Sequence, residues 1–231
     1  MLKQCLSNLI SLLNRYPRVV RPTSLGIFVA LSLIACGGST GFEPVVTGVK
    51  AQSLMYGHTA SILLGGKDLR STITVDTQGA CTSPSFSASS TTELLVLNCR
   101  ALNVGEFLLS VKSAQGDLLF TEKLTIPKPQ VMLLTSKGNI TLELEPDFAP
   151  VSVNNFLTYV SQGYYKGTIF HRVIDGYMAQ AGDTTGTGLS GSRYLDLKAE
   201  FTDTPFKRGS LGMARDPSDK DSANSQFFIC L

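Results

Sequence analysis

The sequence has few of the residues on which most enzyme chemistry depends. Its 231 residues contain two histidines, His58 and His171, and no tryptophan. No Cys/His cluster has the spacing of metal ligands, so neither a metal site nor a metal cofactor is expected, and His58 is predicted to lie in a polar loop. His171 is the only candidate base in the second half of the chain, and its neighbours lack the nucleophile elbow of a Ser/His hydrolase.

Acidic residues and long apolar runs are both missing from the first 35 residues. This segment has four basic residues and no Asp or Glu, and its apolar run covers only residues 25–34. A membrane-spanning helix needs about 20 apolar residues. A short apolar run behind a basic flank is instead typical of a signal peptide, which we assign to residues 1–35.

The signal-like segment ends in Leu-Ile-Ala-Cys, residues 33–36. This tetrapeptide resembles the processing box of bacterial lipoproteins, which implies that Cys36 is lipidated and becomes the first mature residue. The alternative is an ordinary signal with an unrelated cysteine. Residues 36–44 are expected to form a flexible tether. The implied location is the bacterial cell envelope, with the protein anchored to a membrane by lipid and facing the periplasm or the outside.

An excess of positive charge is also missing once the signal is set aside. The chain has 20 basic and 18 acidic residues, and without the four basic residues of the signal 16 basic residues face 18 acidic ones. Nucleic-acid recognition usually requires a clustered positive surface. We therefore expect no nucleic-acid partner.

Residues 45–126 have few helix signals and several short strand patterns separated by Gly, Asp, Ser and Asn. Strands at this spacing predict a small β-sandwich. The segment 52–66 also resembles the opening of the immunoglobulin-like repeats called IPT or TIG domains, which implies a positioning or binding role. The expected strands cover residues 60–64, 71–75, 93–98, 106–111 and 117–125.

Cysteine usage agrees with export. Cys5 would leave with the signal and Cys36 would carry lipid, so Cys81 and Cys99 remain as a possible pair and Cys230 is left over. In an oxidising compartment a disulfide closing a loop of about eighteen residues could stabilise the sandwich by roughly 3 kcal/mol. The alternative is two buried thiols.

A proline-rich linker at residues 127–130 separates the sandwich from a different pattern. Residues 131–135 and 140–145 alternate around a Lys-Gly turn and predict a hairpin. A helix is expected to begin at Pro150 and to end at Gly163. Its apolar stripe consists of Val153, Phe156, Leu157 and Val160.

Two motifs dominate the rest of the chain. Residues 170–183 read Phe-His-Arg-Val-Ile-Asp-Gly-Tyr-Met-Ala-Gln-Ala-Gly-Asp, and residues 225–229 read Ser-Gln-Phe-Phe-Ile. The first motif alternates as a strand, turns at Asp-Gly and continues as a second strand, with Gln180 on the same side as Met178. A guanidinium from Arg172, an amide and a thioether should therefore lie close together on adjacent strands.

These motifs, with Met-Ala-Arg at residues 213–215 between them, resemble the cyclophilins, the peptidyl-prolyl cis/trans isomerases. The resemblance begins near residue 131 and continues to residue 231. It implies a mainly β chain, in which a small β-sandwich precedes an incomplete cyclophilin-like β-barrel with one helix. The implied activity is proline isomerisation during extracytoplasmic protein folding, with proline-containing polypeptides as partners and no cofactor.

The resemblance also assigns roles to individual residues. Rotation of an X-Pro amide crosses a resonance barrier of about 18 to 20 kcal/mol, and any group that stabilises the twisted amide lowers it. Arg172 is the candidate catalytic residue, the alternative being a solvated surface arginine. The implied substrate-binding residues are Tyr177, Met178 and Phe228 around the proline ring, and Gln180, Ala214 and Gln226 along the peptide.

Residues 186–191 fit the pattern G-x-G-x-x-G. The dinucleotide fingerprint requires this pattern inside a strand–turn–helix unit, which the surrounding sequence does not provide. We therefore predict a mobile loop beside the candidate site, as the resemblance to cyclophilins implies.

A cyclophilin domain normally continues beyond the point that corresponds to Leu231. We therefore expect residues 225–231 to form a strand that lacks at least one neighbour, to aggregate through that edge and to leave the chain nearly inactive, while residues 45–126 fold normally. Two other functions stay open. One is a non-catalytic chaperone that binds proline peptides, and the other is a surface attachment lipoprotein that acts through residues 45–126.

Overall fold

The structure is a computed structural model that describes residues 43–70 and 72–231. The predicted signal peptide, the lipidation site Cys36 and most of the predicted tether lie outside the described residues. Within the described ranges the chain has thirteen strands and a single helix, so it is mainly β, as predicted. No helix in these ranges is both long and apolar enough to cross a membrane.

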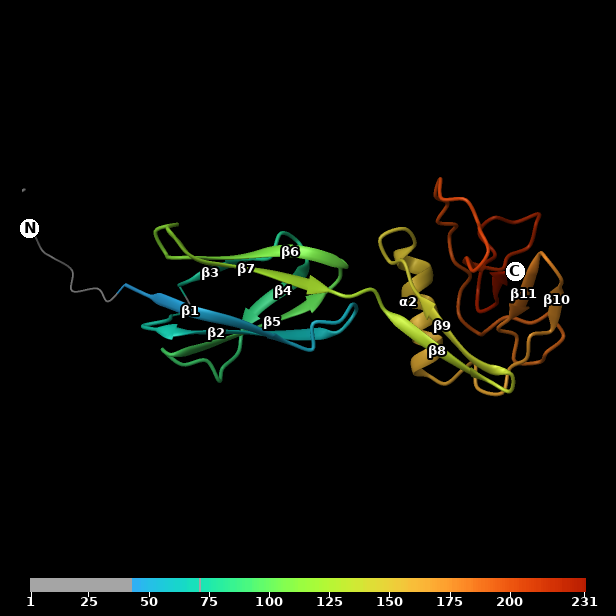
Figure 1. Cartoon of the computed structure of the whole chain (residues 1–231), viewed down its shortest axis with the longest axis horizontal. Coiled ribbons are helices and arrows are strands. Elements are labelled where there is room, and N and C mark those ends of the chain that lie inside the picture. The colour runs from blue at the N-terminus through green and yellow to red at the C-terminus, as the bar shows by residue number, and fades with distance from the viewer. Residues whose placement is uncertain (1–42, 71) are drawn as a thin grey trace, which may run out of the picture. The chain divides into compact units, whose positions relative to one another are not determined.

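The first half of the described chain forms two antiparallel sheets that lie in two layers (Figure 1). The larger sheet has the order β1-β2-β5-β4 and the smaller one β3-β6-β7. The strands are β1 (Val45–Gln52), β2 (Thr59–Lys67), β3 (Thr74–Asp76), β4 (Cys81–Phe86), β5 (Leu94–Ala101), β6 (Gly105–Lys112) and β7 (Leu118–Ile126).

Alternate side chains of the two sheets form the sandwich core. In β2, Ala60, Ile62 and Leu64 are fully buried, and in β6 Leu109 and Val111 are. This spacing of two is the period with which side chains change faces along a strand. Because burial of each large aliphatic side chain contributes about 1.5 to 3 kcal/mol, the sequence pattern and the two-layer packing have the same cause.

Four of the five expected strands of the sandwich are present, and the fifth, expected at 71–75, is found as the shorter β3 at Thr74–Asp76. β1 and β4 were not predicted. β1 contains Gly48 at a register shift, and β4 contains Pro84 at another. Proline is tolerated at bulges and in edge strands, and β4 is an edge strand of its sheet. Gly48 and Pro84, residue types that are common in turns, are therefore the reason that the sequence pattern did not predict β1 and β4. The likeness to IPT or TIG domains stays a prediction.

A disulfide joins Cys81 to Cys99, whose Cα atoms are 5.4 Å apart. The two residues belong to β4 and β5, which are paired neighbours in one sheet. Both side chains are buried. The cross-link therefore ties an edge strand to a central strand.

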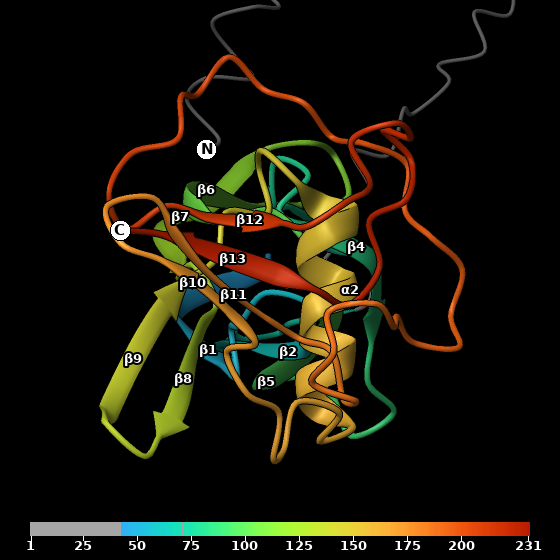
Figure 2. The same ribbon diagram turned by 90° about the vertical axis from the view of Figure 1, so that its right-hand side faces the viewer.

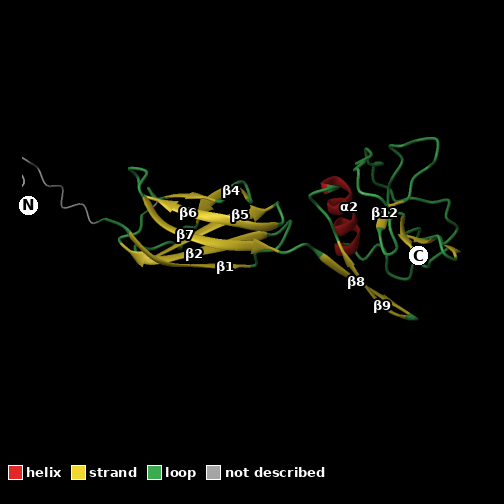
Figure 3. Ribbon diagram, turned by 45° about the horizontal axis from the view of Figure 1, so that its top comes forward, coloured by secondary structure: helices red, strands yellow, loops and turns green. Residues whose placement is uncertain are grey.

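The predicted hairpin and helix are confirmed in the second half. β8 (Gln130–Thr135) pairs with β9 (Gly138–Glu143), and α2 (Pro150–Ser161) has a proline in its first turn (Figure 3). A residue distant in sequence caps the N-terminus of this helix: Glu200 accepts hydrogen bonds of 2.8 Å from the backbone N–H groups of Val151 and Ser152. This contact links the loop around residue 200 to the helix.

The buried face of α2 differs in part from the prediction. Val153 and Phe156 are buried as expected, whereas Leu157 and Val160 are only half-buried. The most buried residue is Tyr159, which was not predicted. Its ring packs within 6 Å, between centroids, of three tyrosine rings that come from loops: Tyr164, Tyr165 and Tyr194.

The last sheet has the strand order β10-β11-β13-β12, and Figure 2 shows β13 between β11 and β12. The prediction that residues 225–231 lack a neighbour is therefore wrong, because the short strand β12 returns to pair with β13. The edges of this sheet are β10 and β12 instead. No closed barrel is present among the described residues. The strands are β10 (Arg172–Ile174), β11 (Met178–Ala181), β12 (Leu211–Met213) and β13 (Phe227–Cys230).

Candidate active site

Strand register aligns three of the predicted site residues. Arg172 in β10 is opposite Gln180 in β11, which is opposite Phe228 in β13. Residues that are directly opposite on neighbouring antiparallel strands project from the same face, with Cβ atoms about 4.5 to 5.5 Å apart. A guanidinium, an amide and an aromatic ring therefore follow one another across the sheet, and Met178 lies on the same face two residues before Gln180.

The other face of this sheet is attached to the core. Phe227 is buried, and its ring centroid lies 5.4 Å from that of Phe156 in α2 and 5.4 Å from that of Tyr165. Edge-to-face aromatic contacts of this kind are favourable beyond the area that they bury. The face that carries Arg172 is thus held on a rigid support.

Two glutamine side chains extend the row. Gln180 Nε2 donates to Gln226 Oε1 at 2.8 Å. Gln226 Nε2 in turn donates to the backbone oxygens of Gly188 at 3.1 Å and of Ser190 at 2.8 Å. Because a carbonyl only accepts hydrogen bonds, these contacts determine which end of each amide faces which neighbour.

The loop that provides these carbonyls is built around Asp183. Its fully buried carboxylate accepts hydrogen bonds from the backbone N–H groups of Thr185, Gly188 and Ser190 at 2.8, 2.7 and 3.3 Å. The hydroxyls of Thr185 and Thr187 also donate to it. Burial alone would raise the pKa of Asp183, but the hydrogen bonds from Thr185, Ser190 and Gly188 outweigh it and hold that pKa well below its usual value.

Hydrogen bonds hold both ends of the loop at residues 186–191 that was predicted to be mobile. Beyond the Asp183 contacts, Asn224 accepts a 2.8 Å hydrogen bond from the N–H of Ser192 and donates one of 2.9 Å to the carbonyl of Tyr194. The loop does lie beside Gln226, as expected. A loop with this many hydrogen bonds is more constrained than the glycine-rich sequence indicated.

A close backbone approach brings β11 to Gln226. Gly182 has a φ of +97°, and a Cβ added there would lie 2.5 Å from the backbone oxygen of Ser225. The hydroxyl of the buried Ser225 donates to the carbonyl of Gly182 at 2.9 Å, and Tyr165 donates its own hydroxyl to the carbonyl of Ser225 at 2.9 Å. The position therefore accepts only glycine without distortion.

The remaining predicted residues have different surroundings. Ala214 is half-buried and donates its N–H to the carbonyl of Gln226 at 2.9 Å. Phe228 packs on Phe206, with ring centroids 5.2 Å apart. Met178 is 4% exposed, whereas Tyr177, in the turn before β11, is 63% exposed. The two side chains thus differ in exposure, and their grouping around the proline ring stays a prediction.

Three residues near the site were missed by sequence reasoning. Asp183 had a local signal, because an aspartate followed by Thr, Gly and Ser residues favours side-chain-capped turns. Asn224 and Phe206 had none, since their partners are distant in sequence or belong to another strand. Contacts of this kind depend on register and not on local pattern.

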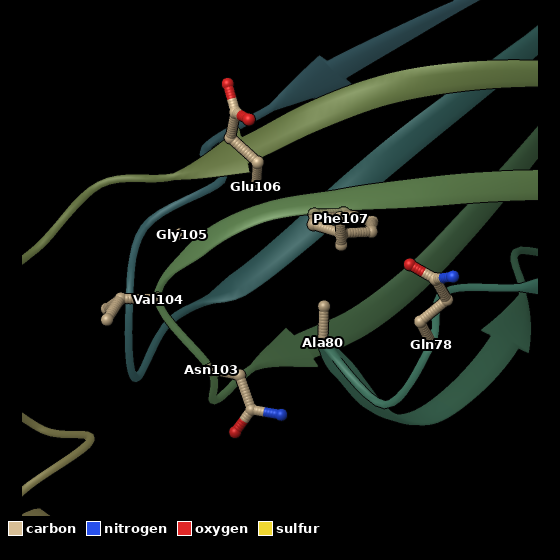
Figure 4. A pocket seen from close by; sticks show the side chains of 7 residues that line it. All are labelled: Gln78, Ala80, Asn103, Val104, Gly105, Glu106 and Phe107. Atoms are coloured by element: carbon tan, nitrogen blue, oxygen red, sulfur yellow. The ribbon is translucent and has the colours of Figure 1, made fainter.

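The site is separate from two shallow cavities of the described residues. One, of about 140 Å³, lies in the first half and is lined by the side chains of Gln78, Asn103 and Phe107 among others (Figure 4). The other, of about 370 Å³, lies beside Arg193 and Tyr194. The predicted site residues line neither cavity. In the part of the chain that the structure describes, no three His, Cys, Asp or Glu side chains are grouped so that they could hold a metal ion.

Residues 130–231 match the family model described as cyclophilin type peptidyl-prolyl cis-trans isomerase/CLD. A protein of Brucella suis biovar 1, called a probable peptidyl-prolyl cis-trans isomerase, is 46% identical over 114 residues, with 45% of this chain and 58% of that protein covered. Peptidyl-prolyl cis-trans isomerase A of Dickeya dadantii is 50% identical over 109 residues, with 43% and 52% covered. The chain thus spans about half the length of the curated relatives that it matches.

A solved structure is also similar in sequence. It is the cyclophilin type peptidyl-prolyl cis-trans isomerase of Cryptosporidium parvum in the presence of the dipeptide Ala-Pro, at 36% identity and a TM-score of 0.42. The match covers 44% of this chain and 67% of that one. The region that matches the family model, residues 130–231, carries Arg172 and its row.

Proposed function

Because residues 130–231 belong to the cyclophilin-type peptidyl-prolyl cis-trans isomerase family, we propose that this protein catalyses the cis/trans isomerisation of X-Pro bonds in polypeptides. The observation that carries the proposal is the row formed by Arg172, Gln180 and Phe228 on one face of the last sheet. The row combines a permanent cation, an oriented amide and an apolar ring. An isomerase needs these groups and does not need a nucleophile.

The proposed mechanism is stabilisation of the twisted amide. In the planar ground state the prolyl nitrogen shares its lone pair with the carbonyl, and the resulting barrier is about 18 to 20 kcal/mol. As the bond rotates the nitrogen regains its lone pair and becomes an acceptor. A donor such as the exposed Arg172 guanidinium then gains a hydrogen bond in the transition state that the ground state lacks, which lowers the barrier.

The neighbouring groups would hold the peptide. The half-buried Phe228 offers apolar surface to the pyrrolidine ring, with the buried Met178 on the same face of the sheet. The amides of Gln180 and Gln226 offer hydrogen bonds to the main chain beside it. Ala214 leaves room for the peptide at the edge of Gln226. The Cryptosporidium parvum relative was solved in the presence of Ala-Pro, which supports a proline-containing polypeptide as the partner.

The test of the catalytic role is Arg172→Ala. Exchange NMR on an X-Pro peptide reports both the isomerisation rate and peptide binding. We expect turnover to fall by about 10² or more, the size typical of losing one preorganised donor, with little loss of affinity. Arg193→Ala is the matched control, since Arg193 is an exposed arginine outside the row. Unchanged turnover in a folded Arg172→Ala protein would rule Arg172 out.

The same measurement separates isomerase from chaperone. A protein that binds the peptide but does not accelerate exchange, with or without Arg172, is a proline-peptide binder and not an isomerase. A surface attachment lipoprotein acting through residues 45–126 would show neither response.

We further propose a lipid anchor at Cys36 and a role in protein folding at the bacterial cell envelope. The basic flank, the short apolar run and the Leu-Ile-Ala-Cys segment support this location. Each buried CH₂ of an acyl chain contributes about 0.8 kcal/mol of membrane affinity. We expect Cys36→Ser to move the protein from the membrane to the soluble fraction, with Cys230→Ser as the control. A Cys36→Ser protein that stays in the membrane fraction refutes the anchor.

A further inference from the structure

The loop after β11 is organised by a buried anion that the proposed mechanism does not use. None of the ion pairs among the described residues includes Asp183. Its charge is balanced by N–H and O–H donors from residues 185–190 alone. An ionised carboxylate has about four acceptor sites and no donor, so it is the side chain suited to gather several donors at one point.

Two of the residues that donate to Asp183 also bind Gln226. Gly188 donates its N–H to Asp183 Oδ2 at 2.7 Å and accepts from Gln226 Nε2 at 3.1 Å. Ser190 donates its N–H to Asp183 Oδ2 at 3.3 Å and accepts from the same Nε2 at 2.8 Å. The carboxylate thereby holds two carbonyls that point at one amide nitrogen.

The loop also lies close to His171. A Cβ added at Gly188 would lie 3.0 Å from Cδ2 of His171, so the His171 ring leaves no room for a side chain at Gly188. Both nitrogens of that ring are buried and have no hydrogen-bond partner among the residues that the structure describes. The ring therefore acts on the loop by contact and does not compete with Asp183 for its donors.

These contacts fix the direction of both amides. Because Nε2 of Gln226 faces two carbonyls, Oε1 of Gln226 faces Gln180. Gln180 therefore presents its Nε2 group to this oxygen and donates a hydrogen bond of 2.8 Å to it. Gln180 Oε1 is then the end of that amide left for other donors, on the sheet face where Arg172 is its cross-strand partner. An acceptor beside a guanidinium restrains its orientation, whereas an NH₂ group in the same place would not.

We propose that Asp183 is a positioning residue, which through the loop 183–190 sets the amide orientation of Gln226 and Gln180 and so the polarity of the surface beside Arg172. Its importance for turnover rests on the proposed isomerase function. The amide orientation itself does not. Asp183 touches no peptide in this scheme, because it acts through two backbone carbonyls and two side chains.

The test is hydrogen exchange of the side-chain NH₂ groups of Gln180 and Gln226, followed by NMR in the full chain. Asp183→Asn places an NH₂ among N–H donors and should speed exchange at Gln226 on the order of tenfold, the size expected when one hydrogen bond is lost. Asp219→Asn is the matched control, because Asp219 is an exposed aspartate whose carboxylate accepts a single hydrogen bond, from the N–H of Asp221.

Thr185→Val keeps the test decisive if Asp183→Asn does not fold. It removes a hydroxyl that donates to both carboxylate oxygens from an exposed position, and should speed the same exchange to a smaller extent. Unchanged side-chain exchange in folded Asp183→Asn, or in Thr185→Val should the first variant be unfolded, overturns the proposal.

A kinetic measurement separates this proposal from the proposed function. In an active protein Asp183→Asn should lower kcat more than it raises KM for an X-Pro peptide, a split that a general loss of stability does not produce. Altered side-chain exchange in a protein without isomerase activity would refute the proposed function and leave the amide orientation standing. Normal turnover and normal side-chain exchange in Asp183→Asn would refute the positioning role of Asp183 and leave the proposed isomerase function standing.

Discussion

At the scale of single residues, Asp183 gives the clearest link between local chemistry and pH. Its hydrogen bonds hold its pKa below the usual value of about 3.9. A carboxylate with a lowered folded-state pKa contributes stability that is fully present above the unfolded-state pKa and is lost as the pH falls through the folded-state value. The loop should therefore weaken only in acid.

This gives a prediction for acid unfolding. We expect Asp183→Asn to be less stable than the parent at pH 7 and to lose less stability than the parent when the pH is lowered from 7 to 3, as measured by urea denaturation. Asp216 and Asp221 also have lowered pKa values, caused by hydrogen bonds from Ser218 and Ala199 respectively. The free energy of unfolding of the variant should therefore still decrease as the pH falls, but less steeply than that of the parent. Parallel pH dependences in the two proteins would contradict this role of the carboxylate.

Gly182 gives a second prediction at this scale. Gly182→Ala and Gly209→Ala both place a side chain at positive φ, at +97° and +85°, which costs about 1 to 2 kcal/mol. Only at Gly182 would the new Cβ collide with backbone, since nothing lies within 4 Å at Gly209. We expect an additional loss of about 1 to 3 kcal/mol for Gly182→Ala in chemical denaturation. Equal losses at the two sites would show that the close approach to Ser225 relaxes easily.

At the scale of elements, the spacing of apolar residues and the positions of glycine and proline predicted the features that depend on local sequence. Alternation located the hairpin β8–β9 and the face shared by Arg172 and Gln180, and Pro150 marked the start of α2. Local pattern could not show that β12 returns beside β13, because three residues of strand carry too little signal. It also missed β4, whose proline and serines are typical of turns, and the burial of Tyr159, which depends on tyrosines from loops.

The disulfide gives a prediction for one element pair. Because Cys81 and Cys99 are separated by 18 residues, chain entropy predicts that the link stabilises the sandwich by about 3 kcal/mol. A Cys81→Ala, Cys99→Ala protein should show that loss in the unfolding transition of the first two sheets. Cys230→Ser, which removes the free cysteine of the described residues, should leave this transition unchanged. An unaltered unfolding transition of the sandwich in the double variant would mean that the backbone hydrogen bonds between β4 and β5 suffice to hold β4 in its sheet.

At the scale of the whole molecule, the sequence predicts a signal segment, a β-sandwich and a second half that resembles the cyclophilins. Residue motifs predicted which residues gather on the last sheet, because motif and strand register have the same period. They could not predict that Asp183 and the loop carbonyls orient Gln226, since those contacts depend on the fold of residues 183–190. The expected inactivity of the chain rested in part on an unpaired strand at residues 225–231, and that strand is paired on both sides.

The most direct test of the account is the rate at which the intact chain interconverts the cis and trans forms of an X-Pro peptide, measured by exchange NMR. The uncatalysed reaction takes tens to hundreds of seconds. We predict exchange that accelerates in proportion to protein concentration and that is lost in Arg172→Ala but kept in Arg193→Ala. Exchange at the uncatalysed rate, at concentrations where peptide shifts show binding to a folded chain, would contradict it.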